Sequence, residues 1–402
     1  MVKPGYKQTD LGLLPEEWAC REIGSFADVC MCKRIFAEQT TEMGEIPFYK
    51  IGTFGKKADA YISRPLFEEY KQKYSYPQKG DVLISAAGTL GRTVVYDGEE
   101  AYFQDSNIVW LDIDKSQISN DYLYHYYKVI KWTPSEGSTI ARLYNGIITS
   151  TNVAVPPKPE QEAIAEALTD IDTLIVNLEK LIAKKKAIKQ GAMQELLTGK
   201  RRLPGFSGDW TECVLTDVAD LMTDTIPVSD IDPRYYVGTD NMVSNRGGVK
   251  QNRIELQYSA VRHYMINDIL LSNIRPYLKK IWYADTNGGC SSDVLVIRTK
   301  NDGKILAGFL YQLLSQDVFF EEVTANAVGT KMPRGDKNVI KAYPLCMPVD
   351  LQEQREILKI LSEMQVEIEN LEKNLNKYKQ IKQGMMSELL TGRIRLIDKE
   401  DA

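Results

Sequence analysis

Residues 160–203 read EQEAIAEALTDIDTLIVNLEKLIAKKKAIKQGAMQELLTGKRRL, and residues 353–396 read EQREILKILSEMQVEIENLEKNLNKYKQIKQGMMSELLTGRIRL. The two stretches align without a gap, and about half of their positions are identical. An internal repeat of this length indicates a duplicated structural unit. The chain is therefore organised around two copies of one segment.

Apolar residues recur in both copies at alternating intervals of four and three, the spacing of the a and d positions of a coiled coil. The seam positions are Ile164, Leu168, Ile171, Ile175, Leu178 and Ile182 in the first copy and Ile357, Leu361, Met364, Ile368, Leu371 and Leu375 in the second. Such a stripe is also found inside ordinary helical bundles, but two copies with matched seams favour pairing with each other. The pattern leaves parallel and antiparallel order open.

Each copy is long enough for one uninterrupted helix, from about 160 to 198 and from about 352 to 391. At 1.5 Å per residue, each helix is roughly 55–60 Å long. Pro159 and Asp350 are suited to open the helices. Gly199 and Gly392 stand where a glycine commonly ends a helix.

The two blocks outside the repeat, roughly 1–155 and 204–347, are rich in Tyr, Gly, Asn and short β-type runs. They resemble each other only locally. GDVLIS (80–85) aligns with NDILLS (267–272), and GSTIARL (137–143) aligns with GTKMPRG (329–335), which places Arg142 opposite Arg334. The blocks are thus predicted to be homologous domains that have diverged at most positions.

The segments that enter the two blocks also match, because LPEEW (14–18) precedes the first and RRLPGFSGDW (201–210) the second. The tail RIRLIDKEDA (393–402) stands where the entry to a third domain would be. We therefore expect an α+β chain of four parts. These are a first domain (1–155), a central spacer helix (156–203), a second domain (204–347), and a C-terminal spacer helix with its tail (348–402). Such a chain can close into a circular, pseudo-twofold repeat if its helices pair antiparallel.

Composition places the chain among soluble proteins, with 402 residues, 43% apolar and 26% charged. We expect no membrane association, because no uncharged apolar run approaches the length of a bilayer span. The start, MVKPGYKQTDLG, lacks the apolar core of a secretion signal, and the six cysteines form no disulfide-like framework. A cytoplasmic protein is expected. The net charge of −5 neither indicates nor excludes nucleic-acid binding.

The sequence contains no recognisable catalytic set. It lacks the phosphate-binding GxxxxGK[ST] loop, the GxSxG elbow, the HExxH motif and the [DNS]PP[YFW] tetrapeptide of amino-methyltransferases. Only two histidines are present, which argues against a histidine-rich metal site. The run Glu69-Tyr70-Lys71 matches the ExK half of a nuclease motif but has no convincing partner carboxylate, so a solvated charge pair on a helix is the better explanation. We predict no catalysis and no cofactor or metal in this chain.

Basic and amide side chains instead gather with aromatics on glycine-rich or proline-interrupted loops. Arginine reads guanine and asparagine reads adenine through paired hydrogen bonds, while lysine and arginine neutralise phosphate. The DNA-binding candidates are Lys56, Lys57, Thr89, Arg92, Arg142, Tyr144, Asn145, Asn241, Arg246, Asn273, Arg275, Tyr277, Lys279, Lys331 and Arg334. Each one alone is more simply a solvated loop residue, and the signal lies in their clustering at corresponding places. The basic run of Lys184, Lys185, Lys186, Lys189, Lys200, Arg201 and Arg202 is either a solvated helix face or a contact with DNA or a partner.

These features together resemble the specificity subunit of type I restriction–modification systems. The likeness rests on the EQ openings at 160 and 353, the two KQG-x-M-x-ELLTG endings, GDVLIS, NDILLS and GTKMPRGD (329–336). It covers essentially the whole chain. The first block has GSTIARLYNG (137–146) where the second has GTKMPRGD, so the carry-over of that loop is firmer for the second block.

The resemblance implies an architecture and a set of partners. Each block would be a target-recognition domain, and the two long helices would pair as an antiparallel coiled coil that spaces the domains. The target would be double-stranded DNA with two unlike half-sites and an unspecified spacer. Two modification subunits that methylate adenine N6 with S-adenosylmethionine, and two restriction subunits that use ATP and Mg²⁺, would assemble with the chain. The competing hypotheses are a methyltransferase or nuclease fused into one chain, and a degenerate coiled-coil scaffold.

Overall fold

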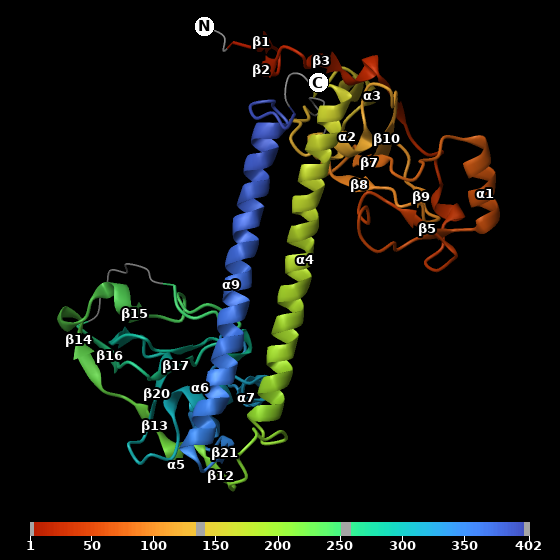
Figure 1. The fold of residues 1–402 in the computed structure, drawn as a ribbon. Coiled ribbons are helices and arrows are strands. Elements are labelled where there is room, and N and C mark those ends of the chain that lie inside the picture. Colours follow the sequence, from red (N-terminus) through yellow and green to blue (C-terminus); the bar gives the residue numbers. More distant parts are fainter. Residues whose placement is uncertain (1–3, 134–140, 251–258, 398–402) are drawn as a thin grey trace. The chain divides into compact units, whose positions relative to one another are not determined.

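The structure is a computed structural model that describes residues 4–133, 141–250 and 259–397 (Figure 1). It divides into one unit of residues 1–179 with 373–402 and another of residues 180–372. Each unit contains one globular domain and one part of each of two long helices, α4 (Lys158–Leu196) and α9 (Leu351–Leu389). Within the described ranges, no helix combines the length and the hydropathy of a membrane span.

The first domain is built on an antiparallel sheet in the order β4–β10–β7–β8. Its strands are β4 (Ala27–Cys30), β7 (Val82–Ser85), β8 (Thr93–Val95) and β10 (Ile108–Ile113). All four residues of β7 are buried, which suits a central strand of a covered sheet. Its Ile84 shares one core with Leu123 of α2 (Asn120–Tyr126) and Ile164 of α4. The long helix is therefore part of this domain's core.

Three smaller pieces complete the first domain. Two are strand pairs, β1 (Tyr6–Thr9) with β2 (Gly12–Pro15) and β3 (Ala19–Glu22) with β11 (Asn152–Val155). The third is the sheet β6–β5–β9, made of β5 (Ile46–Tyr49), β6 (Tyr61–Ile62) and β9 (Tyr102–Phe103). With α1 (Arg64–Lys73), this sheet forms an aromatic core that includes Phe48, Phe54, Phe67 and Tyr102. Short helical turns are η1 (Ile23–Ser25), η2 (Ala37–Gln39) and α3 (Asn145–Thr149).

The second domain repeats this topology, with an antiparallel sheet in the order β13–β20–β17–β18. The strands are β13 (Ala219–Met222), β17 (Ile269–Ser272), β18 (Ile281–Tyr283) and β20 (Val294–Thr299). Beside it lie the pair β12 (Trp210–Val214) with β21 (Pro344–Pro348) and the sheet of β14 (Thr225–Pro227), β16 (Ala260–Tyr264), β19 (Gly288–Cys290) and β15 (Tyr236–Val237). The helices are α5 (Leu215–Val218), α6 (Ala307–Leu314), α7 (Asp317–Ala325) and α8 (Lys337–Lys341), and the short turns are η3 (Val228–Asp230), η4 (Pro233–Tyr235) and η5 (Pro276–Leu278).

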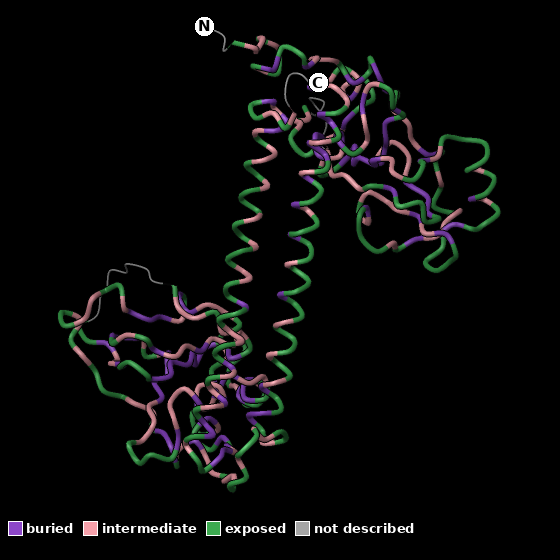
Figure 2. Tube along the Cα trace, viewed as in Figure 1, coloured by how far each residue is buried: buried purple, intermediate pink, exposed green. Residues whose placement is uncertain are grey.

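The predicted correspondence between the domains holds in detail. Arg142 forms an isolated antiparallel bridge with Ala87, two residues beyond β7. Arg334 forms the same bridge with Ile274, two residues beyond β17. The two arginines that the sequence aligned thus occupy equivalent backbone positions. Figure 2 shows that buried residues concentrate inside each domain, whereas the helices alternate between buried and exposed positions.

The long helices run antiparallel within each unit. In the first unit, Glu179 of α4 pairs with Lys379 of α9 at 2.7 Å, and Asp172 pairs with Lys382. In the second unit, the Lys186 ammonium lies 2.6 Å from the Glu372 carboxylate. Residue numbers rise along one helix as they fall along the other, which decides the question that the heptad pattern left open.

The seam residues face inward as predicted. Ile164, Leu168, Ile357 and Leu361 are almost fully buried, because they also enter the domain cores. The remaining seam positions are buried or half-buried. Polar neighbours on the same helices are mostly exposed. The heptad stripe is therefore a helix–helix seam that merges into the domain core at its buried end.

The basic run on α4 has a role that neither sequence hypothesis included. Lys185 pairs with Glu367 at 2.6 Å, Lys186 with Glu372, and Lys189 donates to the Gln365 amide oxygen at 2.7 Å. Burial lowers the pKa of Lys189. These three cations pair with the second helix within the chain, while the Lys186 side chain is still 57% exposed, so a contact of this run with DNA or a partner stays a prediction.

The repeated EQ dipeptide connects each helix start to its domain. Gln161 is fully buried and donates to the carbonyl oxygens of Gln117 and Pro156 at 2.8 and 2.9 Å. Gln354 is also fully buried and donates to the carbonyl oxygens of Lys304 and Pro348 at 3.1 and 2.9 Å. A glutamine serves here because its amide satisfies backbone groups that burial would otherwise leave unpaired.

The glutamate of each EQ dipeptide receives an arginine from the segment after the other long helix. Glu353 accepts two hydrogen bonds of 2.7 Å from Arg202. Glu160 accepts hydrogen bonds from Arg395 at 2.8 Å and from the Trp18 indole at 2.7 Å. The tail that follows α9 thus enters the first domain in the way that the segment after α4 enters the second.

Glycine ends both helices for a steric reason. Gly199 and Gly392 have φ values of +68° and +66°, in the left-handed region that favours glycine. A Cβ on Gly392 would lie 2.5 Å from Pro15, and one on Gly199 would lie 3.1 Å from the Trp210 ring. The LTG endings therefore allow close packing as well as a helix stop.

A buried histidine predicts an acid-sensitive first unit. Burial, and then the nearby Lys128, lower the pKa of His125 from 6.5 to about 4. Asp172 and Lys382 also face the ring. Between about pH 6.5 and 4, His125 is protonated in the unfolded chain but neutral in the folded chain. The free energy of unfolding should therefore fall as pH falls through this window.

Denaturant unfolding of the wild type and of His125→Gln at several pH values measures this effect. We expect the variant to have a flatter dependence of stability on pH between 6.5 and 4. Parallel curves for the two proteins would contradict the assignment.

Candidate nucleic-acid interface

In the second domain, the exposed candidates lie on two loops that are bonded to each other. We name residues 273–280 and 328–335 the second loop pair. The Arg275 amide donates to the Pro333 carbonyl at 2.7 Å, and the Gly335 amide donates to the Asn273 carbonyl at 3.0 Å. The first loop joins β17 to β18 of the main sheet, and the second, which joins α7 to α8, is bridged to it through Ile274 and Arg334. The sheet thus sets their position.

Four predicted residues project from the second loop pair into solvent. They are Arg275, Tyr277, Lys331 and Arg334. Tyr277 is 51% exposed, although it is aromatic, and Met332 beside Lys331 is exposed to the same extent. Arg334 makes one ion pair, with Asp293 at 3.0 Å. Exposed arginine, lysine and aromatic side chains on bonded loops are suited to contact bases and phosphates.

Four other predicted residues of this domain are engaged inside the protein. Asn241 is 4% exposed, and its amide bonds to the backbone at Gly238 and Tyr236. Asn273 is 8% exposed. Arg246 and Lys279 both pair with the Asp317 carboxylate, at 2.5 and 2.6 Å. These ion pairs lower the pKa of Asp317, with Lys279 as the larger cause. As placed, Asn241, Arg246 and Lys279 support the loops, and Asn273 is buried.

The first domain has an equivalent first loop pair, residues 86–92 and 141–145. The Leu143 amide donates to the Ala86 carbonyl at 2.8 Å. Thr89, Tyr144 and Asn145 are exposed, and Arg142 is half-buried at the bridge. This pair therefore displays mainly hydroxyl and amide groups where the second displays cations.

The Arg92 side chain is turned inward. Its guanidinium donates to the Ile51 carbonyl at 2.9 Å and stacks over Phe54 at 5.2 Å. It thereby connects the first loop pair to the turn that carries Lys56 and Lys57, both of which are exposed. Arg92 corresponds to Lys280, because the Ser85 amide donates to the Arg92 carbonyl and the equivalent Ser272 amide donates to the Lys280 carbonyl. Both cations also donate to a backbone carbonyl of their own domain, Ile51 and Thr239 respectively.

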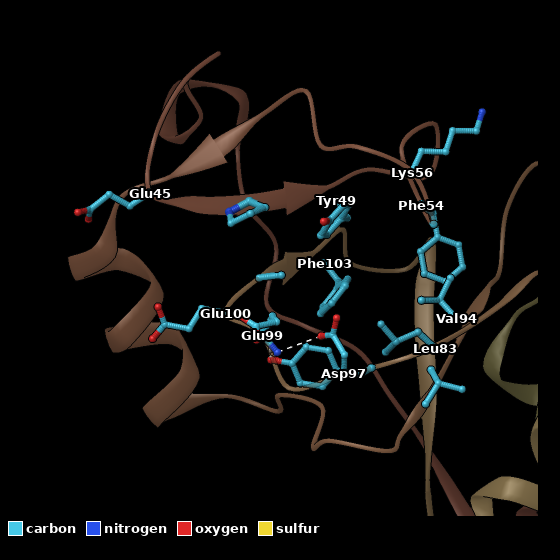
Figure 3. Close-up of a pocket in the computed structure, with 15 residues that line it drawn as sticks. Glu45, Tyr49, Phe54, Lys56, Leu83, Val94, Asp97, Glu99, Glu100 and Phe103 are labelled. Atoms are coloured by element: carbon cyan, nitrogen blue, oxygen red, sulfur yellow. Dashed lines mark hydrogen bonds between the residues drawn. The ribbon is translucent and has the colours of Figure 1, made fainter. Parts of the chain in front are cut away.

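A cavity of about 570 Å³ lies in the first domain beside Lys56 (Figure 3). Aromatic residues such as Tyr49 and Phe103, which stack at 5.8 Å, form part of its wall. Its other lining residues include the carboxylates of Glu45, Asp97, Glu99 and Glu100. Four carboxylates against one lysine repel phosphate, so the cavity itself is poorly suited to the DNA backbone.

Two acidic residues that organise the second loop pair were absent from the sequence-derived set. Asp317 begins α7 and holds two cations, while Asp293 holds Arg334. Nothing in the neighbouring sequence marks either residue as part of the site. An aspartate at a helix start, such as Asp317, is ordinary because it is favoured by the helix dipole. The half nuclease motif is explained by structure as well, because Glu69 pairs with Lys73 at 2.9 Å on the exposed face of α1.

Comparison with protein families gives two matches in one chain. The model described as the type I restriction modification DNA specificity domain matches residues 15–190 and again residues 207–382. The chain belongs to this family. Each match contains one globular domain and the first part of the long helix that follows it. Each match to the specificity domain therefore covers one globular domain together with most of the repeated helical segment that follows it.

Curated relatives bear the same family name. A type I restriction enzyme specificity subunit of Haemophilus influenzae is 60% identical over 153 residues, which is 38% of this chain and 40% of that protein. The EcoDI specificity subunit of Escherichia coli is 23% identical over 405 residues, covering 91% of this chain and 85% of its own length.

The solved S subunit of the type I restriction–modification system from M. genitalium has a similar fold. It matches with a TM-score of 0.60 at 16% identity, covering 92% of this chain and 96% of that chain. The specificity-family assignment therefore agrees with the α+β fold and its two long helices.

Proposed function

We propose that this chain is the non-catalytic sequence-reading subunit of a type I restriction–modification complex. Each domain binds one half of a bipartite, asymmetric double-stranded DNA target. The observation that carries the proposal is the contrast between the loop pairs. Their scaffolds share strand order and bridge positions, but their exposed side chains differ. Two domains with the same scaffold but different exposed side chains are suited to bind two different half-sites.

The division of chemistry follows from the residues. Methylation of adenine N6 requires the base to be flipped into a pocket of the enzyme. The sequence has no methyltransferase tetrapeptide and no phosphate loop. We therefore assign S-adenosylmethionine to two modification subunits, and ATP with Mg²⁺ to two restriction subunits. This chain supplies sequence selection and a scaffold.

Methylome sequencing of cells that express this chain with its modification partner tests the proposal. The expected result is a split motif with methyladenine in both halves and an unspecified spacer between them. A continuous palindrome, or the absence of any motif, would exclude the proposal. Methylation or cleavage by this chain alone would instead favour the fused-enzyme hypothesis, while absence of a motif favours a degenerate scaffold.

Arg334→Ala should weaken methylation that depends on the second domain's half-site. The side chain is exposed on the second loop pair, and a base or phosphate contact by arginine contributes roughly 1–3 kcal/mol. The measurement is the affinity of the complex for duplexes that differ only in one half-site. Lys337→Ala, an exposed change at the start of α8, is the control. Equal affinity of Arg334→Ala and wild type would contradict the prediction.

A partner surface is available on α4. Leu181 and Ile188 lie seven residues apart on this helix and are 39% and 47% exposed. An apolar stripe with this period beside a seam can pack against a further helix. We assign it to the modification subunit.

Replacing both Leu181 and Ile188 by glutamate should weaken association with the modification subunit roughly 10- to 100-fold for each side chain. The change should leave the fold intact, because both side chains are exposed. Ala183→Glu introduces the same charge at an exposed position outside the stripe and is the control. Titration of the purified chain with the modification subunit measures the effect, and unchanged binding would refute the assignment.

A further inference from the structure

We propose that Arg275 is a specificity-determining residue of the second domain, reading a guanine, and that Asp317 positions it. This inference rests on the proposed function. It adds the base class and the residue that holds the reader in place.

Backbone conformation singles out Arg275. Counted from the equivalent serines Ser85 and Ser272, Arg275 occupies the position of Gly88 in the first domain. Both residues are left-handed, with φ of +51° at Arg275 and +68° at Gly88. Glycine adopts this conformation without steric strain, whereas arginine does not. The first domain thus shows that glycine is compatible with the scaffold, and the second domain retains an arginine in spite of the strain.

Strain is concentrated around this loop. Among the described residues, six non-glycine residues have positive φ, and four of them are Asn245, Arg246, Arg275 and Lys279. Asn245 and Arg246 are bonded to the end of the same loop, since the Asn245 amide donates to the Leu278 carbonyl and the Arg246 amide to the Lys279 carbonyl, both at 2.9 Å. Strained backbone persists only where its surroundings over-determine it, and such sites are concentrated at functional positions.

One carboxylate secures the two strained segments. Asp317, the first residue of α7, accepts a hydrogen bond from Arg246 at 2.5 Å and another from Lys279 at 2.6 Å. Arg246 also lies over the Phe320 ring of the same helix, at 5.4 Å. The buried Pro276 and the Arg275–Pro333 backbone bond fix the other side of the loop. The direction in which Arg275 leaves the backbone is therefore set before any ligand binds.

The same contacts decide which cation of this loop is available. Lys279 is paired with Asp317, and Lys280 donates to the Thr239 carbonyl at 2.6 Å. The guanidinium of Arg275 is exposed and makes no hydrogen bond or ion pair with the described part of the chain. A guanidinium held in a fixed direction matches the two acceptors, O6 and N7, that guanine presents in the major groove.

The decisive variant is Arg275→Gly, because it relieves backbone strain while it removes the reader. In the complex with the modification subunit, we expect thermal stability equal to or above that of the wild type. We also expect a roughly 10- to 100-fold loss of preference for one guanine of the second half-site. Binding is measured on the wild-type target and on duplexes with each base pair of that half-site replaced. An unchanged preference at every position, or a wild-type half-site without guanine, overturns the proposal.

Asp317 has its own readout. Asp317→Asn should reduce the same guanine preference, while binding to duplexes that lack this guanine stays near its wild-type value. Asp317→Glu, which keeps the negative charge, should have a stronger guanine preference than Asp317→Asn. A uniform loss on all duplexes would show a general structural role and overturn the positioning assignment. If the wild-type complex has no split motif, the proposed function fails first. If the motif exists and Arg275→Gly reads it normally, only this inference fails.

Discussion

Arg395→Ala is expected to unfold the first domain at a temperature where the second remains folded. The Glu160 side chain is fully buried, and Arg395 supplies its charge partner from a residue 235 positions away. Removal of one partner leaves an uncompensated buried carboxylate, which destabilises proteins by about 3–5 kcal/mol. Because the Trp18 indole still donates to Glu160, the lower end of this range is the better expectation.

The measurement is hydrogen exchange or thermal unfolding resolved by domain. Arg393→Ala is the matched control, since Arg393 lies two residues away and its guanidinium is exposed. Arg202→Ala should transfer the effect to the second domain, where Arg202 pairs with the buried Glu353. Equal stability of Arg395→Ala and Arg393→Ala would show that the tail does not hold the first domain.

Matched insertions of seven residues in both long helices should abolish methylation of the original split motif. One heptad preserves the seam and lengthens each helix by about 10.5 Å, or about three base pairs of DNA. Suitable points follow Ile182 and Leu375. They lie between the ion pairs of the first unit, such as Glu179 with Lys379, and those of the second, such as Lys186 with Glu372. No described ion pair is interrupted.

Any motif that the lengthened protein retains should have the same half-sites and a spacer longer by about three base pairs. A seven-residue insertion after Ile182 alone is the control. It leaves α9 unmatched, so we expect a loss of recognition and of stability. If the doubly lengthened protein methylates the original motif at the wild-type rate, the helices do not set the spacing of the half-sites.

The helical frame was predictable because its signal is local and repeated. The heptad pattern predicted the seam, and Ile164 and Ile357 are indeed almost fully buried. Alignment of the two blocks predicted that Arg142 and Arg334 correspond, and their equivalent bridges confirm it. The relative direction of the two helices was not predictable from the heptad pattern, because an a/d stripe fits parallel and antiparallel pairing equally well. It was decided by ion pairs between residues far apart in the chain.

The candidate interface was predictable only as a region. Sequence reasoning placed Arg246, Lys279 and Arg275 in one class, as exposed loop cations. Structure separates them, since Asp317 forms ion pairs with the first two and leaves Arg275 available. Asn241 has the residue type of an adenine reader, but its side-chain amide is hydrogen-bonded to the backbone of its own loop.

The sequence by itself determined the repeat, the two helices with their seam, and the pairing of equivalent positions between the domains. These properties follow from periodicity and identity along the chain. Only the tertiary structure decided which polar groups are available to a ligand, because a charged group can form an ion pair with any opposite charge that the fold places within a few ångströms of it. For Lys279 that group is 38 residues away, and for Glu160 it is 235 residues away.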